Sequence, residues 1–285
     1  MTLGEALTNA ENTLRDAGVE NARLEAEGLL AHSLKAGRAA LYARLKEELG
    51  DEAAWSFLGL VGRRAAREPS QYLTGEAEFC GLTFSVTPAV LIPRPETEIL
   101  VEEGAGYLKE NAAALVADLG TGSGCIAVSL ALRLPGAQVY AVDSSVFALE
   151  VAGKNARAHG VDGRVKFLLG DLFGPLESEG LSGKLDLIVS NPPYIPSGEI
   201  PGLQPEVLYE PIGALDGGPD GLEFIKWLIN RSPVYLKAGG WLLIEIGMGQ
   251  ADSVRSLVEA EAALEYIGFI KDFAGIERVL VAKRK

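Results

Sequence analysis

Between residues 115 and 246, short apolar runs alternate with stretches of helical periodicity, and this alternation restricts the fold more than any other feature. The runs are four to six residues long and almost continuously apolar, as strands are when both faces of a parallel sheet are covered. They are 115–118, 138–143, 165–169, 185–190 and 241–246. The helical stretches around them lie near 96–112, 124–134, 145–158, 220–230 and 250–260. This pattern predicts an α/β fold with a mostly parallel sheet.

The chain begins with a part that shows helical spacing only. Apolar residues recur at steps of three and four through much of residues 1–70, which predicts a small helical bundle. Thr2 and Glu5 stand in the arrangement of a capping box at the start of the first helix. The bundle ends near a basic run of Arg63, Arg64 and Arg67. We interpret this run as a solvated helix face, with contact to an acidic partner as the alternative.

Two hairpins are predicted, one before the α/β part and one at its end. Residues 71–94 contain two short strand-like runs broken by Gly81, which is typical of a β-hairpin. The last two runs, near 265–270 and 278–282, leave little room for a helix between them and favour an antiparallel pair. The sheet then has seven strands. We divide the chain into a helical domain (1–70), a hairpin linker (71–94) and an α/β domain (95–285).

Composition excludes several classes of function. The 285 residues include 26 Lys and Arg against 39 Asp and Glu, and this net charge of −13 argues against a duplex-binding protein. Cys80 and Cys125 offer neither a disulfide framework nor zinc-ligand spacing, and His32 and His159 both fall in helical stretches. No signal-peptide pattern and no run of about 18 apolar residues is present. We expect a cytoplasmic monomer that binds no metal, no membrane and no nucleic acid directly.

A glycine-rich turn follows the first strand of the α/β part and opens a helix. Its residues are Asp118, Leu119, Gly120, Thr121, Gly122, Ser123 and Gly124. Glycines let the backbone turn sharply and approach a ligand, and ligands of such sheets bind at the carboxyl ends of strands. Asp143 ends the next strand, where its carboxylate can accept hydrogen bonds from both hydroxyls of a ribose. A turn without a ligand is the alternative, but the two acidic residues at neighbouring strand ends favour nucleoside binding.

The kind of nucleoside is less constrained. The glycine spacing is Gly-x-Gly-x-Gly, so the third glycine of a dinucleotide fingerprint is missing from its usual place. S-adenosylmethionine carries no phosphate and needs no anion-binding helix end, and Asp118 lies near the expected place of its aminoacyl part. Asp171, after the third strand, can accept a hydrogen bond from the adenine amino group, with a turn or helix cap as the alternative. Both a dinucleotide and S-adenosylmethionine remain open at this point.

The segment Asn191-Pro192-Pro193-Tyr194 follows the fourth strand, at the same sheet edge as the glycine turn. It suits methylation of a planar amide or nucleobase nitrogen, which shares its lone pair with a π system and is a poor nucleophile. The Asn191 side-chain oxygen and the Pro192 carbonyl can each accept one N–H, which turns the lone pair toward a methyl donor. The two prolines stiffen the loop, and Tyr194 can stack on the flat group. An ordinary Pro-Pro turn is the alternative.

Several segments, taken together, resemble one enzyme family. They are Gln71-Tyr72-Leu73-Thr74-Gly75, Glu78-Phe79-Cys80-Gly81-Leu82, Leu91-Ile92-Pro93-Arg94-Pro95-Glu96-Thr97-Glu98, the Asn191 tetrapeptide and Glu245-Ile246-Gly247. Over nearly its whole length the chain resembles the peptide chain release factor glutamine methyltransferases. The resemblance implies the Rossmann-like fold of class I S-adenosylmethionine-dependent methyltransferases. It also implies methyl transfer to N5 of the glutamine in the Gly-Gly-Gln motif of class I release factors, with S-adenosyl-L-homocysteine as the product.

The resemblance further implies roles for single residues. Residues 120–124 and Asp143 hold the cofactor in this comparison, and Asn191 touches both the cofactor and the glutamine. Pro192, Pro193 and Tyr194 complete the glutamine pocket. One departure concerns Leu172, which occupies the adenine pocket where some members of that family have Trp. Leucine keeps the apolar contact with the adenine but loses aromatic stacking.

Two other functions remain open on the sequence alone. A nucleic-acid amino-methyltransferase of the adenine N6 type uses the same tetrapeptide, although the excess of acid argues against it. The function of a nicotinamide dehydrogenase or of a non-catalytic nucleotide-binding module would explain the glycine turn but not the Asn191 tetrapeptide. Two segments also have open roles. Residues 94–98 are either the start of a helix or a cofactor contact, and residues 195–221 are interpreted as a lid or substrate-binding loop.

Overall fold

The computed structural model describes residues 1–111 and 113–285, and these residues group into two compact units. The helical unit comprises Met1–Glu76 and Gln204–Tyr209, and the sheet unit comprises Ala77–Leu203 and Glu210–Lys285. The break after residue 76 falls close to the predicted end of the helical part. The presence of residues 204–209 in the helical unit has no counterpart in the division that the sequence suggested.

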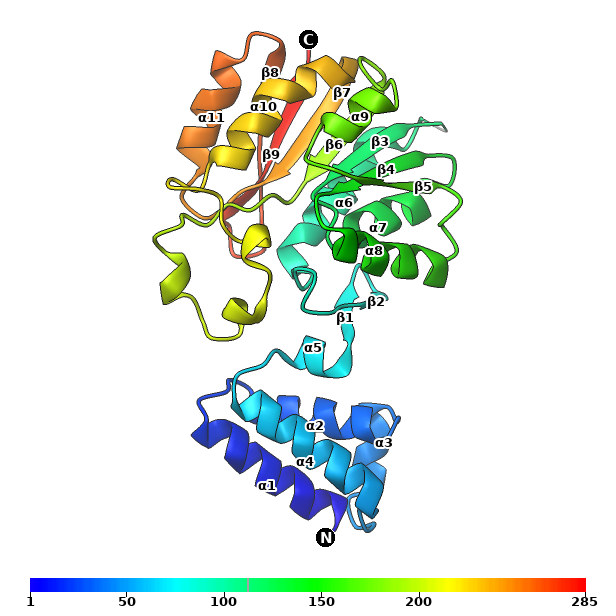
Figure 1. Cartoon of the computed structure of the whole chain (residues 1–285), viewed down its shortest axis with the longest axis vertical. Helices are drawn as coiled ribbons and strands as arrows, with labels where there is room; N and C mark the ends of the chain where they lie inside the picture. The colour runs from blue at the N-terminus through cyan, green and yellow to red at the C-terminus, as the bar shows by residue number, and fades with distance from the viewer. Residues whose placement is uncertain (112) are drawn as a thin grey trace. The chain divides into compact units, whose positions relative to one another are not determined.

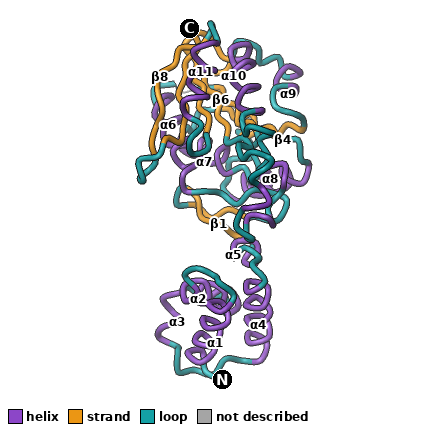
Figure 2. The backbone as a smooth tube through the Cα atoms, turned by 90° about the vertical axis from the view of Figure 1, so that its left-hand side faces the viewer, coloured by secondary structure: helices purple, strands orange, loops and turns teal. Residues whose placement is uncertain are grey.

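The helical unit is built from short amphipathic helices. They are α1 (Leu3–Asp16), α2 (Ala22–Ser33), α3 (Arg38–Ala43), α4 (Asp51–Ala65) and α5 (Ser70–Thr74). Figure 2 shows α1, α2 and α4 beside one another, and their buried faces supply Leu7, Leu30 and Phe57 to one apolar core. The predicted capping box is confirmed, because the Glu5 amide donates to the Thr2 hydroxyl and the Thr2 amide donates to the Glu5 carboxylate.

The interpretation of the basic run as a solvated face holds for Arg63, whose side chain is 55% exposed, but was wrong for Arg64 and Arg67. Arg64 is only 5% exposed and contacts the carboxylates of Glu25 and Glu206 at 3.2 and 3.0 Å. Arg67 reaches both carboxylate oxygens of Glu206 through two nitrogen atoms, each at 2.7 Å. The Tyr209 hydroxyl donates to a backbone carbonyl just beyond α4. The acidic partner is therefore a residue of this same chain, carried by the segment 204–209.

The sheet unit contains, among the described residues, one two-stranded hairpin and one seven-stranded sheet. The strands are β1 (Glu76–Phe79), β2 (Leu82–Ser85), β3 (Leu115–Leu119), β4 (Gln138–Asp143), β5 (Val165–Leu169), β6 (Leu185–Ser190), β7 (Leu236–Glu245), β8 (Leu264–Lys271) and β9 (Glu277–Arg284). The seven-stranded order is β5-β4-β3-β6-β7-β9-β8. Strands β3 to β7 are parallel, whereas β9 lies antiparallel between β7 and β8. The predicted fold class is confirmed.

Helices cover both faces of this sheet. They are α6 (Glu98–Leu108), α7 (Cys125–Arg133), α8 (Val146–Ala158), α9 (Gly174–Ser178), α10 (Glu223–Tyr235) and α11 (Ala251–Ala260). The first three contribute to one apolar core and the last three to the other, and Figure 1 shows α10 beside α11. Successive residues of β3 point to opposite cores, Val116 to the first and Ala117 to the second. Burial on both sides explains why inner strands such as β3 and β6 read as continuous apolar runs.

Some element boundaries differ from the predictions. Helix α6 ends at Leu108, and residue 112, the predicted end of that helix, lies outside the described residues. Strand β7 begins at Leu236, but its pairing with β6 is irregular until Trp241 because the strand passes through Gly239 with φ of 79°. Helix α9 was not predicted, since five residues are too short to show a period. Among the described residues, no helix combines the length and the hydropathy of a membrane span.

Candidate active site

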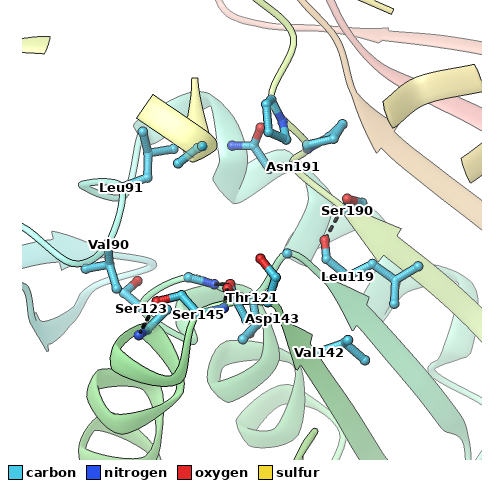
Figure 3. Close-up of a pocket in the computed structure, with 18 of the residues that line it drawn as sticks. Val90, Leu91, Leu119, Thr121, Ser123, Val142, Asp143, Ser145, Ser190 and Asn191 are labelled. Atoms are coloured by element: carbon cyan, nitrogen blue, oxygen red, sulfur yellow. Dashed lines mark hydrogen bonds between the residues drawn. The ribbon is translucent and has the colours of Figure 1, made fainter. Parts of the chain in front are cut away.

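The order of the strands reverses between β3 and β6. From β3 the chain runs outward through β4 and β5, and it then returns across β3 to form β6. At such a switch point the loops after two neighbouring strands diverge and leave a crevice at the carboxyl ends of the strands. A cavity of about 480 Å³ lies there (Figure 3), and the Ser190 hydroxyl ties the two strand ends together by donating to the Leu119 carbonyl at 2.7 Å.

The loop after β3 forms one wall of this cavity. Gly120, Gly122 and Gly124 have φ of 76, 54 and 78°, in the left-handed region that favours glycine. Asp143, at the end of β4, supports the loop because its Oδ2 accepts the Gly122 amide proton at 2.9 Å. Its Oδ1 accepts the Ser145 amide proton at the same distance, and each oxygen keeps a lone pair for a ligand. Figure 3 shows Asp143 across the cavity from Asn191.

Asp118 lies beneath the glycine loop rather than on the wall of the cavity. Its side chain is fully buried, and its Oδ2 accepts the Thr121 hydroxyl proton at 2.6 Å. Burial raises the pKa of Asp118 to about 7, although the hydrogen bond from Thr121 acts in the opposite direction. The geometry gives Asp118 a role in holding the loop, and its proximity to the aminoacyl part of a cofactor stays a prediction.

Most of the other predicted site residues line the same cavity. Asp171 and Leu172 follow β5, and Leu172 adopts φ of 41°, which is uncommon for a residue with a side chain. Asn191, Pro192 and Pro193 line it from the loop after β6. The structure thus brings together residues that are more than 70 positions apart in the sequence. Gly124 and Tyr194 lie next to lining residues but are not part of the wall.

Tyr194 instead joins the tetrapeptide to the base of the long loop that follows. Its ring packs against the apolar core between the sheet and α10 and α11, and its hydroxyl lies 3.4 Å from Glu245 Oε1. The Gln250 side chain donates to the carbonyls of Tyr194 and Gly221, at 2.9 and 3.2 Å. At Gly217 a Cβ would lie 2.8 Å from the Tyr194 Cα, so the loop base has room only for glycine. The stacking role of Tyr194 stays a prediction.

Further residues of the wall come from two segments whose roles the sequence left open, namely Arg94 and Thr97 from 94–98 and Pro211, Gly213 and Ala214 from 195–221. Sequence reasoning assigned no site role to Ala89, Val90 and Phe224, which also line the cavity. Arg94 pairs with Glu210, whose buried carboxylate also accepts the Ile92 amide proton at 3.0 Å. Pro95 opens a short 3-10 helix, η1 (Pro95–Thr97), that leads into α6, which confirms the predicted helix start. The segment 91–98, one of those that resemble the enzyme family, indicated this wall. No pattern in the sequence around Phe224 indicates that this residue lines a site.

The walls fit a nucleoside that carries an uncharged or cationic substituent. Ser123 lines the cavity and is almost completely buried. The Asp143 carboxylate offers two acceptor oxygens at the edge of β4, as a ribose requires. Among the described residues, no cluster of three or more His, Cys, Asp or Glu has the arrangement of a metal site.

Comparison with known proteins agrees with this geometry. Residues 5–75 match the family model of the PrmC N-terminal domain, and residues 96–201 match that of the methyltransferase small domain. A release factor glutamine methyltransferase from Geobacter sulfurreducens is 47% identical over 98% of this chain and 95% of its own length. The one from Moorella thermoacetica is 48% identical over 100% and 99%.

Solved structures show the same fold at lower identity. A ribosomal protein L11 methylase from Lactobacillus delbrueckii subsp. bulgaricus has a TM-score of 0.51 and 21% identity, over 70% of this chain and 84% of that one. This likeness bears on the fold alone. The identity to the two curated relatives, which extends over nearly the full length of all three chains, is much stronger. The chain therefore belongs to the family of release factor glutamine methyltransferases, which are S-adenosylmethionine-dependent enzymes.

Proposed function

We propose that this chain methylates the side-chain amide N5 of the glutamine in the Gly-Gly-Gln motif of class I release factors. One observation carries the proposal: the glycine loop, Asp143 and the Asn191-Pro192-Pro193 rim line a single cavity at the switch point of the sheet. A methyl donor and a planar amide can therefore meet in one enclosed space. The names of the relatives support a release factor as the substrate.

S-adenosylmethionine supplies an electrophilic methyl carbon when it is bound. Residues that line the cavity provide the contacts that its nucleoside part requires. Asp143 accepts hydrogen bonds from the ribose hydroxyls, and Asp171 accepts one from the adenine amino group. Leu172 contributes an apolar wall. The positive φ angles of Gly120 and Gly122 let the backbone approach the ligand without a Cβ between them.

The rim of the cavity orients the glutamine. The Asn191 side-chain oxygen and the Pro192 carbonyl each accept one proton of the substrate amide, which directs the nitrogen lone pair toward the methyl carbon. Positioning of this kind is worth roughly 7–11 kcal/mol in favourable cases. A single buried hydrogen bond contributes only about 1–3 kcal/mol. Geometry therefore dominates the rate. The attacking nitrogen needs no strong base before the transfer, because the protonated amide that forms when it takes the methyl group is acidic and then loses its proton.

The remaining parts of the chain receive roles in substrate recognition. The helical unit recognises the release factor and presents its glutamine to the tetrapeptide. The loop from 195 to 221 acts as the substrate-binding loop, and the lining residues Pro211, Gly213 and Ala214 support this role. The Gln250 side chain holds the base of this loop on Tyr194, and the absence of a Cβ at Gly217 permits the close approach of the two backbones.

The test is mass spectrometry of a class I release factor after incubation with the enzyme and isotope-labelled S-adenosylmethionine. We expect one labelled methyl group, on the glutamine of the Gly-Gly-Gln motif. A label on another residue, or none, would contradict the proposal. A label on an oligonucleotide, together with binding that weakens steeply with salt, would favour a nucleic-acid amino-methyltransferase. Calorimetric titration with S-adenosylmethionine and with NAD distinguishes either methyltransferase, which binds the first, from a dehydrogenase, which binds the second.

A further inference from the structure

The side chain of asparagine ends in two groups with opposite hydrogen-bonding roles. The carboxamide carries an acceptor oxygen and a donor NH2 group, which exchange places when the group turns by 180°. Only the oxygen can accept a proton from a substrate amide, so Asn191 serves the proposed reaction in one of these two orientations. A neighbouring group that distinguishes the oxygen from the nitrogen must therefore hold it.

The structure contains a chain of hydrogen bonds that does so. The Asn191 Nδ2 donates to the Thr97 hydroxyl oxygen at 3.0 Å. The Thr97 hydroxyl in turn donates to Oε2 of Glu245 at 2.7 Å. Thr97 and Glu245 are each only 2% exposed, so water does not compete for these bonds. The Tyr194 hydroxyl donates to the other oxygen of the same carboxylate at 3.4 Å.

The topology places these residues together. Strands β6 and β7 are parallel neighbours, and their register pairs Ser190 with Ile244. Asn191 is the first residue after β6, and Glu245 is the last residue of β7, so the two lie at the same level of neighbouring strands. Thr97 is the last residue of η1, at the entrance to α6, which packs against both strands. The sheet and one helix start thus define the arrangement without any contribution from the long loop.

The direction of the hydrogen bonds follows from proton counting. An ionised carboxylate has no proton and can only accept, so the Thr97 hydroxyl must give its single proton to Glu245. Its oxygen is then able only to accept, and the group that donates to it must be the NH2 of Asn191. We propose that Thr97 and Glu245 are positioning residues that orient the Asn191 carboxamide so that its oxygen meets the substrate amide, an inference that rests on the proposed function.

The ionisation of Glu245 sets the conditions for a test. Burial raises the pKa of Glu245 to about 7, and the hydrogen bond from Thr97 opposes this shift. Glu96 raises the pKa further, whereas Arg278 and the Tyr194 hydroxyl lower it. The carboxylate is therefore mostly ionised at about pH 8.5, which is the condition for the measurements below.

Two substitutions at Thr97 separate the hydroxyl from the shape of the side chain. Thr97→Val keeps the volume but removes the hydroxyl, and we expect kcat for the release factor to fall about 10- to 100-fold. KM for the factor and Kd for the cofactor should change little, because orientation is lost rather than binding. Thr97→Ser keeps the hydroxyl and should restore most of kcat. Ser232→Ala, which removes a buried hydroxyl from α10, should leave kcat unchanged.

A second measurement needs no substrate and so separates this inference from the proposed function. In protein labelled with ¹⁵N at asparagine, the side-chain resonances of Asn191 are assigned by their loss in Asn191→Ala. We expect slowly exchanging amide protons in the wild type and in Thr97→Ser, and fast exchange in Thr97→Val and Glu245→Gln. Slow exchange in Thr97→Val, or an unchanged kcat in that folded variant, would overturn the assignment. If no release factor is methylated, the proposed function fails, while the resonances still show whether Asn191 is held.

Discussion

Asn191 is the residue on which the proposed chemistry depends most directly. It lines the cavity beside Pro192, and its amide nitrogen is bound to Thr97, which leaves its oxygen as the acceptor for the substrate. Asn191→Ala removes that acceptor, and we expect turnover to fall on the order of 10²–10³-fold, as when one oriented hydrogen-bond partner is lost from a transition state. Steady-state kinetics with the release factor measures this. Near-normal turnover would contradict the mechanism.

A second prediction at the scale of the residue concerns pH. The pKa of Asp118 is raised to about 7 by burial, so the folded state holds this proton more tightly than the unfolded state. Its contribution to stability is complete below about pH 4 and is lost as the pH rises through about 7. Glu245 acts in the same direction. We expect the free energy of unfolding to decline less steeply between about pH 5 and 8 in Asp118→Asn than in the wild type.

Urea titrations at several pH values measure that slope. Asp216→Asn is the control, because the hydrogen bond from Ser197 lowers the pKa of Asp216, which takes its titration still further below this range. The control slope should equal that of the wild type. Equal slopes in the wild type and in Asp118→Asn would show that Asp118 does not carry a raised pKa.

At the scale of the element, the backbone at the base of the loop 195–221 is packed so closely that Gly217 has no room for a side chain. A Cβ on Gly217 would lie 2.8 Å from the Tyr194 Cα and 2.8 Å from the Gly221 carbonyl oxygen, and neither backbone can yield easily. We expect Gly217→Ala to cost about 1–3 kcal/mol of stability, as overpacking does. Gly198→Ala, at an open position of the same loop, should stay within about 0.5 kcal/mol of the wild type. Chemical denaturation compares the two variants, and equal free energies of unfolding would contradict the close packing at Gly217.

The elements also show which features a sequence can predict. Strands β3, β4 and β6 were predictable because burial on both faces makes each one a nearly continuous apolar run. Asp143 and Asn191 were predictable as site residues because they stand where such a run ends. The contact between Thr97 and Asn191 was not, since it joins positions 94 residues apart and no local pattern records it. Arg64 was misjudged for the same reason, because its partner Glu206 lies 142 residues away.

At the scale of the whole molecule, the helical unit is proposed to bind the release factor. Deletion of residues 1–70 should then raise KM for the folded factor, while KM for a short peptide with the Gly-Gly-Gln motif stays near the full-length value. The deletion also removes Arg64 and Arg67, the partners of Glu206. Glu206→Gln in the full-length chain therefore controls for the release of segment 204–209 alone. An unchanged KM for the folded factor, in a truncation that keeps its cofactor affinity, would refute this role.

The six residues 204–209 belong to the helical unit although the sequence on both sides of them belongs to the sheet unit. Residues 1–76 alone therefore do not make up the whole helical unit, and they cannot be exchanged between proteins as an independent domain. A chimera that takes its first 76 residues from a relative must also take the relative's segment equivalent to 204–209. Otherwise the arginines at positions 64 and 67 meet a segment of different sequence and lose their carboxylate partner. Positions 64, 67 and 206 should accordingly change together as lineages diverge.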